Sequence, residues 1–286
     1  MEFKPSLPSL AKAVSEMSQS FFMYRRVTHF IALCVAAISM FFVEEPWLVY
    51  LLALLAMLIE IAAWFFRHWA EIHHRKSRRL TRLGLFNDAY GKLGESTEIA
   101  NLQFSIEEKA HCRAAEIDKE WEQLGGFFTS DKPKDTVRLL EDLQESAFFS
   151  MHLFKKAAQH VFWGLGIFII SIFVGCLIAF FVFDGNVAFP RVITLLFIFV
   201  IADELGFAFA WHDASGNAGK VVDRLNVVLK TKDYSSQEVI LAILNDYQVT
   251  TAVAPPIPKY VYNAHREGLN ELWGEVKKDK ELLVQE

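Results

Sequence analysis

Acidic side chains lie inside strongly apolar segments of this chain, where a carboxylate is costly unless it has a task or a partner. They are Glu60, Asp203 and Glu204. A charge at the centre of a bilayer costs roughly 2.5–3.5 kcal/mol on insertion scales, so such acids usually face a protein interior or water. One interpretation is that they line a pore or relay protons, since acidic rings in an oligomer would select cations. The alternative is that they reach the interface or pair with basic residues of the first apolar segment, namely Arg25, Arg26 or His29.

A second group of polar side chains forms a basic run directly after an apolar segment. It consists of Arg75, Lys76, Arg78, Arg79 and Arg82. Such a run is typical of the cytoplasmic flank of a membrane span, where it contacts anionic headgroups. The alternative is that the run holds the phosphates of a nucleotide or oligonucleotide, with Tyr90 or Trp121 available for stacking on a base. Near the C-terminus, Tyr262 and Arg266 either complete such a site or cap the helical bundle by packing.

Motifs that would indicate catalysis or metal binding are absent from the sequence. It contains no G-x-x-x-x-G-K-[ST] phosphate loop, no H-E-x-x-H zinc motif and no G-x-S-x-G nucleophile turn. His73 and His74 are adjacent, so on a helix they point about 100° apart and cannot share a metal. The three cysteines form no C-x-x-C pair. We therefore expect a non-enzymatic protein with no catalytic residue, no metal and no resident cofactor.

Four long apolar segments dominate the rest of the chain, which is 53% hydrophobic with a mean hydropathy of +0.23. They cover residues 27–43, 47–66, 161–183 and 189–211. About 20 helical residues cross a ~30 Å hydrocarbon core, so the last three are long enough and the first is marginal. Short turns at 44–46 and 184–186 join the segments in pairs, which predicts two transmembrane helical hairpins.

The positions of lysine and arginine set the expected orientation. Arg25 and Arg26 precede the first span, the basic run follows the second, and Lys155 and Lys156 precede the third, whereas the hairpin turns contain acids. The positive-inside rule therefore places both termini and the segment between the hairpins in the cytoplasm. The predicted parts are a cytoplasmic N-terminal segment, a first hairpin, a cytoplasmic domain, a second hairpin and a cytoplasmic tail, at residues 1–26, 27–66, 67–160, 161–211 and 212–286.

Helical periodicity extends through the cytoplasmic parts, and no segment predicts a strand convincingly. Before the third span, apolar residues recur every three or four positions and form one stripe for packing on another helix. The stripe consists of Leu140, Leu143, Ala147, Met151 and Phe154. The expected fold class is an all-α integral membrane protein, with two transmembrane hairpins, a helical cytoplasmic domain and a helical C-terminal tail.

Two short motifs and the order hairpin, domain, hairpin, tail carry a resemblance to a known family. The motifs are Leu143-Gln144-Glu145-Ser146-Ala147-Phe148-Phe149 and the closing residues Ile257-Pro258, Tyr262, Arg266, Leu269-Asn270 and Trp273. In these features the chain resembles the small bacterial four-helix membrane effectors encoded beside nucleotidyltransferases in anti-phage defence. The family includes the SMODS-associating four-helix effectors and the membrane effector of Hailong-type systems.

The resemblance implies an effector of the bacterial inner membrane that is gated by a cyclic or linear oligonucleotide. A nucleotidyltransferase would be its functional partner, and the effector would assemble in membrane lipid as a homo-oligomer that opens a pore or disrupts the bilayer. Two alternatives stay open. The first is a non-enzymatic membrane scaffold that recruits a soluble partner, and the second is a constitutive ion channel or transporter with Glu60 and Asp203 on its pathway.

Overall fold

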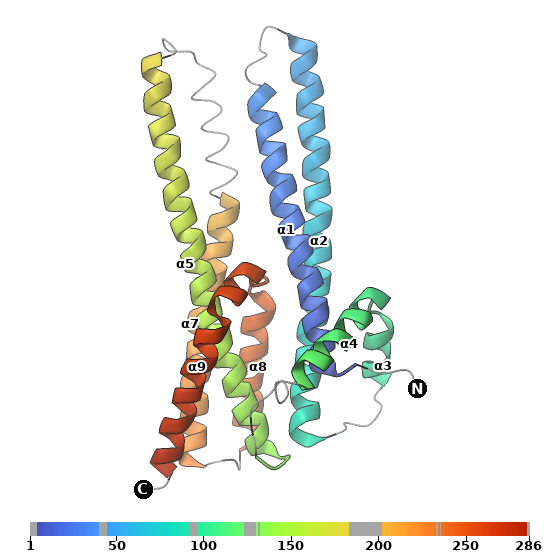
Figure 1. Cartoon of the computed structure of the whole chain (residues 1–286), viewed down its shortest axis with the longest axis vertical. Helices are drawn as coiled ribbons and strands as arrows, with labels where there is room; N and C mark the ends of the chain where they lie inside the picture. The colour runs from blue at the N-terminus through green and yellow to red at the C-terminus, as the bar shows by residue number, and fades with distance from the viewer. Residues whose placement is uncertain are drawn as a thin grey trace. The chain divides into compact units, whose positions relative to one another are not determined.

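The computed structural model of the chain describes eight stretches of sequence. These are residues 5–39, 45–91, 97–122, 130, 132–182, 202–232, 234 and 236–284. Within them every regular element is an α-helix and no strand occurs (Figure 1). The helical fold class predicted from the sequence is thereby confirmed for the described residues.

Eight helices make up the described part of the chain. They are α1 (Leu7–Ser39), α2 (Pro46–Tyr90), α3 (Thr97–Phe104), α4 (Glu108–Glu122), α5 (Thr136–Val182), α7 (Ala202–Thr231), α8 (Gln237–Val253) and α9 (Lys259–Val284). From residue 7 onward, the predicted N-terminal segment is helical and continues without a break into the first apolar segment as helix α1. Its apolar residues at positions 7, 10, 11 and 14 follow helical spacing and continue the helix toward the chain start.

Residues with suitable side chains start these helices. The Ser6 hydroxyl accepts the Ser9 N–H at 3.3 Å before α1, and an Asp135 carboxylate oxygen accepts the Val137 N–H at 2.8 Å before α5. Pro46 occupies the first position of α2, where a missing N–H is harmless. The Ser236 hydroxyl accepts the Val239 N–H at 3.4 Å before α8. Each contact satisfies a backbone donor that has no partner inside its helix.

Three of the described helices are long and apolar enough to cross a membrane. They are Leu7–Ser39, Trp47–Tyr90 and Thr136–Gly175. The predicted turn at 184–186 and the predicted fourth span up to residue 201 lie outside the described residues. A membrane location agrees with these helices, whereas the number of spans and the two hairpins stay predictions.

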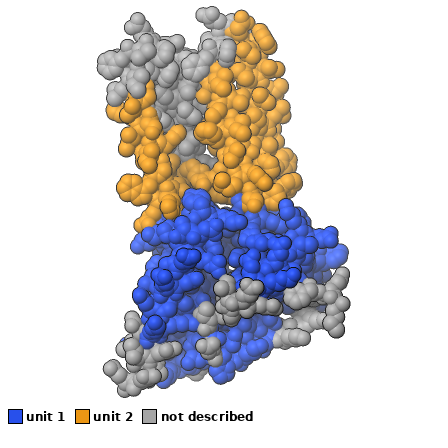
Figure 2. Space-filling view, in the orientation of Figure 1, with its two compact units in different colours: residues 1–19, 72–156, 211–286 blue, residues 20–71, 157–210 orange. Residues whose placement is uncertain are grey.

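The chain divides into two compact units (Figure 2). Unit 1 contains Met1–Gln19, Ile72–Lys156 and Trp211–Glu286, and unit 2 contains Ser20–Glu71 and Ala157–Ala210. The described parts of the first three apolar segments, 27–39, 47–66 and 161–182, all belong to unit 2. We treat these segments as membrane-spanning and the residues of unit 1 as lying outside them.

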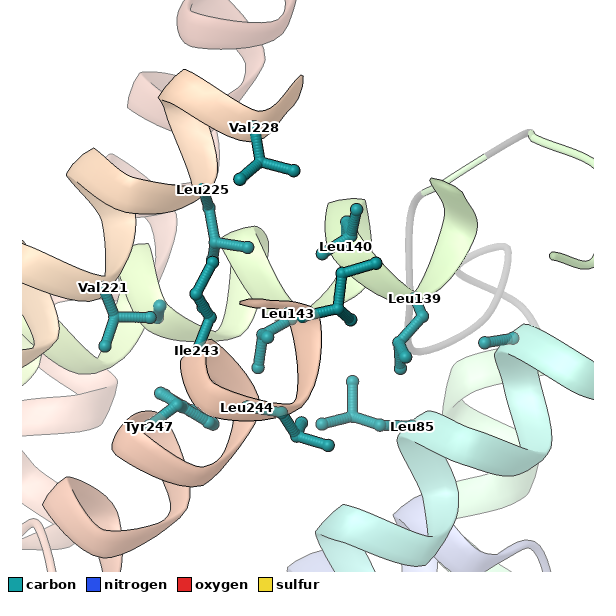
Figure 3. Close-up of a cluster of buried hydrophobic side chains, with 13 residues drawn as sticks. Leu85, Leu139, Leu140, Leu143, Val221, Leu225, Val228, Ile243, Leu244 and Tyr247 are labelled. Atoms are coloured by element: carbon teal, nitrogen blue, oxygen red, sulfur yellow. The ribbon is translucent and has the colours of Figure 1, made fainter. Parts of the chain in front are cut away.

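The first core of unit 1 joins four helices that are distant in sequence (Figure 3). Leu85 of α2, Leu140 and Leu143 of α5, Leu225 of α7 and Ile243 of α8 all have 2% or less of their surface exposed. Burying each such side chain stabilises the fold by about 1.5–3 kcal/mol. Three of the five predicted stripe residues of α5, namely Leu140, Leu143 and Ala147, lie in this core. Phe154 is buried outside the cluster, and Met151 is half-buried.

The second core of unit 1 lies around the start of α1. Leu10 and Val14 of α1, Leu80 of α2, Leu102 of α3 and Ile117 of α4 are buried together there. The Ser77 hydroxyl of α2 also donates to the Ala11 carbonyl of α1 at 2.8 Å. Helix α2 therefore contributes side chains to both cores.

Candidate anion-binding residues and the acids of the spans

Three arginines of the basic run form an exposed line along α2. Arg75, Arg79 and Arg82 are all exposed, and their spacing of four and three residues places them on one helix face. We call these residues the arginine stripe. The other two members of the run point elsewhere: Lys76 donates to the Ser105 carbonyl at 2.6 Å, and Arg78 is partly buried toward Tyr247. Burial lowers the pKa of the Arg78 guanidinium.

The arginine stripe differs from three other arginines of unit 1 in having no carboxylate partner among the described residues. Within the part of the chain that the structure describes, none of its members forms an ion pair, and Arg82 donates only to the Gln248 amide oxygen at 3.4 Å. Other arginines of this unit do form ion pairs, namely Arg113–Glu16, Arg138–Asp88 and Arg224–Asp246. The chain has 34 acidic against 29 basic residues, so acids are not scarce. The stripe is therefore a positive surface with no carboxylate partner among the described residues of an acidic protein.

Tyr262 and Arg266 lie at a different place in unit 1. The Lys12 ammonium of α1 is 5.1 Å from the ring centroid of Trp121 on α4 and 6.0 Å from that of Tyr262 on α9. Burial and then the nearby Arg266 guanidinium lower the pKa of Lys12. We call these four residues the Lys12 cluster. Neither Lys12 nor Arg266 has a hydrogen bond or ion pair with a described residue, although the Glu16 and Glu120 carboxylates lie close enough to oppose the lowering of the Lys12 pKa.

The predicted ligand residues therefore separate into two groups. Among the described residues, no hydrogen bond or ion pair joins Tyr262 or Arg266 to the arginine stripe. Of the two aromatic residues considered for stacking, Trp121 belongs to the Lys12 cluster, whereas the Tyr90 hydroxyl lies 3.3 Å from that of Thr136. Lys12 was missed in the sequence because a lone basic residue within an apolar helix start gives no motif.

Two acids of the spans pair with basic residues of α1 within unit 2. Nε of Arg26 donates to Oε1 of Glu204 at 2.9 Å, and a second bond joins the same side chains. Nδ1 of His29 lies 2.8 Å from Oε2 of Glu60, whose side chain is 47% exposed. The side chain of Asp203 lies outside the described residues. These contacts agree with the pairing alternative for Glu60 and Glu204, and a role in a pore stays a prediction.

An acid that the sequence did not single out is enclosed in the first core. Asp142 of α5 is 0% exposed, and neither carboxylate oxygen has a hydrogen-bond partner in the described structure. The carboxylate of Asp88 lies beside it and accepts from Nε of Arg138 at 2.6 Å. Burial, followed by the neighbouring Asp88 carboxyl, raises the pKa of Asp142 to about 8. Asp142 is therefore mainly protonated at neutral pH.

Within the described helices, no group of three or more histidine, cysteine, aspartate or glutamate side chains is arranged to hold a metal ion. His73 lies 3.5 Å from the Glu107 carboxylate, and the buried ring of His74 has its pKa lowered to about 3 by burial and by Arg78. The two neighbouring histidines thus have separate surroundings within unit 1.

Comparison with known proteins supplies no family for the chain. The arguments about function therefore depend on the contacts above and on the motifs of the sequence. The chain matches no protein-family model, no curated protein and no solved structure.

Proposed function

We propose that the protein is a membrane effector gated by a phosphate-bearing nucleotide signal that binds in unit 1. The observation that carries this proposal is the arginine stripe, three exposed guanidinium groups without a described acidic partner. Arginine suits phosphate because its planar fork of N–H donors binds two oxygens at once. Helix α2 is continuous from Pro46 to Tyr90, so the stripe and the apolar segment 47–66 belong to one helix.

A soluble ligand fits the stripe better than a lipid headgroup does. At 1.5 Å per residue, Arg75 and Arg82 lie about 13 and 24 Å along α2 beyond residue 66, where the apolar segment ends. The headgroup layer adds only about 5–7 Å on each side of the hydrocarbon core. A helix tilt of about 40° would reduce these heights to about 10 and 18 Å, which is still beyond the headgroups. Arg67, paired with Glu71, is the arginine at headgroup level.

Binding at the stripe has enough energy to gate such a protein. A ligand shifts an equilibrium only through a difference in its affinity for the two states, and moving from 1:99 to 99:1 needs about 5.5 kcal/mol. A hydrogen bond to a charged group contributes about 1.5–3 kcal/mol. Two to four such hydrogen bonds formed in one state alone therefore suffice, and three arginines can donate that many because each guanidinium can donate two.

The response in the membrane forms the second part of the proposal. The effector would act in the bacterial inner membrane with both termini in the cytoplasm, assemble as a homo-oligomer, and open a pore or disrupt the bilayer during anti-phage defence. A nucleotidyltransferase would make the signal. The support for this part is the resemblance in layout and motifs, together with three helices apolar enough to span.

Ligand binding by the purified protein tests the first part. We expect a 5′-phosphorylated tetra-adenylate or cyclic di-adenylate to bind the wild type, and Arg75→Gln/Arg79→Gln/Arg82→Gln to weaken that binding at least tenfold. Arg224→Gln is the matched control, because Arg224 is exposed but paired with Asp246. The proposal is wrong if neither probe binds, or if the triple variant loses only its association with anionic lipid vesicles.

Membrane potential in cells tests the second part. A voltage-sensitive dye is read after induction of the protein with and without a co-expressed nucleotidyltransferase. We expect the signal to change the degree of depolarisation in the wild type and to have no effect in the triple stripe variant. Depolarisation that is identical in both proteins, with or without signal, would indicate a constitutive channel. No depolarisation together with a stable protein partner would indicate a scaffold.

A further inference from the structure

The packing of unit 1 does not explain why residue 104 is a phenylalanine. It ends α3 and is 94% exposed, the highest value among the large apolar side chains that the structure describes. The other strongly exposed aromatic residues, such as Tyr50 at 78% and Trp163 at 75%, belong to the apolar helices of unit 2. A single exposed apolar residue is ordinary on its own, so its surroundings decide whether it has a role.

The residues next to Phe104 fix it beside α2. Lys76 of α2 donates to the carbonyl of Ser105, the next residue in the chain, at 2.6 Å. One turn earlier on α2, Nε2 of His73 lies 3.5 Å from the Glu107 carboxylate. The connection from α3 to α4 therefore follows α2 at the level of residues 73–76, which is where the arginine stripe begins.

The helical positions of α2 place this connection at the edge of the stripe. Successive residues of a helix are about 100° apart, so Lys76 and Arg79 are separated by only about 60° around the axis. On the other side of Lys76, Leu80 is buried in the second core. Lys76 thus lies at the border between the packed face and the stripe, and its bond to the Ser105 carbonyl holds the backbone that follows Phe104 at that border.

We propose that Phe104 stacks on a base of the ligand whose phosphates the arginine stripe holds. This inference rests on the proposed function and narrows its ligand to a nucleotide with an accessible base. A cationic surface next to an exposed aromatic ring is the general arrangement for binding single-stranded nucleic acid, because every base has a face that can stack. Inorganic polyphosphate and lipid headgroups have no such face and would gain nothing from Phe104.

The test compares two ligands of equal phosphate number on four proteins, the wild type and three variants. The ligands are a 5′-phosphorylated tetra-adenylate and an abasic tetramer with the same phosphates, and affinity is measured by isothermal titration. We expect Phe104→Ala to weaken tetra-adenylate binding about 5- to 100-fold and leave the abasic tetramer unchanged. Phe104→Tyr keeps a ring and should retain the affinity of the wild type. Leu241→Ala, which truncates another exposed apolar residue of unit 1, serves as the control variant.

The outcomes separate this inference from the proposed function. If wild type binds tetra-adenylate and Phe104→Ala binds it equally well, the stacking role is refuted while the nucleotide site stands. If wild type binds both tetramers with the same affinity, no base is recognised and the inference also fails. If neither tetramer binds, the proposed function itself fails at the arginine stripe. Because Phe104 is almost wholly exposed, its truncation should leave the melting temperature unchanged.

Discussion

Replacing Asp142 with asparagine should remove a strong pH dependence of the stability of unit 1. The carboxyl group is fully enclosed in the first core, beside Asp88 and its ion pair with Arg138. Glu145 adds further negative charge, so ionisation is opposed by burial and by two acids, and only Arg138 favours it. Asparagine has nearly the same shape and cannot ionise.

The size and sign of the effect follow from the difference in pKa between folded and unfolded chains. An aspartate titrates near pH 3.9 when unfolded and Asp142 near 8 when folded, so in this window the folded state binds more protons. The free energy of unfolding therefore falls as pH rises from about 4 to about 8 and is level above that. At 1.36 kcal/mol per unit, the gap of about four units corresponds to about 5 kcal/mol. Asp142→Asn avoids this loss.

Thermal unfolding of detergent-solubilised wild type, Asp142→Asn and the control Asp246→Asn between pH 5 and pH 9 measures the effect. From pH 5 to pH 9, the free energy of unfolding of Asp142→Asn should rise by about 4 kcal/mol relative to that of the wild type. At 2–4 °C per kcal/mol, this corresponds to a difference in Tm of about 8 °C or more. Asp246 is exposed and paired with Arg224, so its variant should follow the wild type. Parallel curves for wild type and Asp142→Asn would refute the argument, because they would mean that Asp142 ionises normally.

Three further predictions concern the cores and the stripe. Leu143→Ala, which empties a fully buried position, should lower the free energy of unfolding by about 2–5 kcal/mol in chemical denaturation, whereas Leu241→Ala, exposed by 59%, should change it by less than about 0.5 kcal/mol. Tyr247→Phe removes a hydroxyl that lies 3.1 Å from Ser150 Oγ and should lower the same quantity by about 1 kcal/mol; no loss would mean that this bond contributes nothing. Arg79→Gln should reduce the slope of log affinity for tetra-adenylate against log salt by about 0.7, while Arg224→Gln leaves the slope unchanged.

The sequence was sufficient for features that depend on local periodicity. The apolar stripe of α5 and the single exposed face shared by Arg75, Arg79 and Arg82 both follow from helical spacing. The start of α1 could have been predicted in the same way, because apolar residues at positions 7, 10, 11 and 14 have helical spacing. The polar residues between them made this pattern difficult to recognise. Periodicity predicts the helix face on which a side chain lies, but it does not predict which other helix packs against that face.

Contacts between distant parts of the chain could not be predicted in this way. Lys12 meets Trp121 and Tyr262 only because α1, α4 and α9 pack together. The burial of Asp142 could not be predicted either, because an acidic residue in a leucine-rich helix is normally expected on the solvent-exposed face. Its enclosure depends on α2, which brings Asp88 and Leu85 against the same turn of α5.

The composition of the first core has a consequence for synthesis of the protein on the ribosome. This core takes residues from positions 85–89, 139–147, 221–228 and 240–247, so it cannot close before α8 has been translated. At a translation rate of about 5–20 residues per second, about 8–30 s pass between the synthesis of Leu85 and that of Tyr247. By then the apolar segments of unit 2 up to residue 182 have left the ribosome. The apolar helices of unit 2 up to residue 182 are therefore available for membrane insertion while the first core is still open, and the leucine side chains of that core stay unpacked throughout the interval.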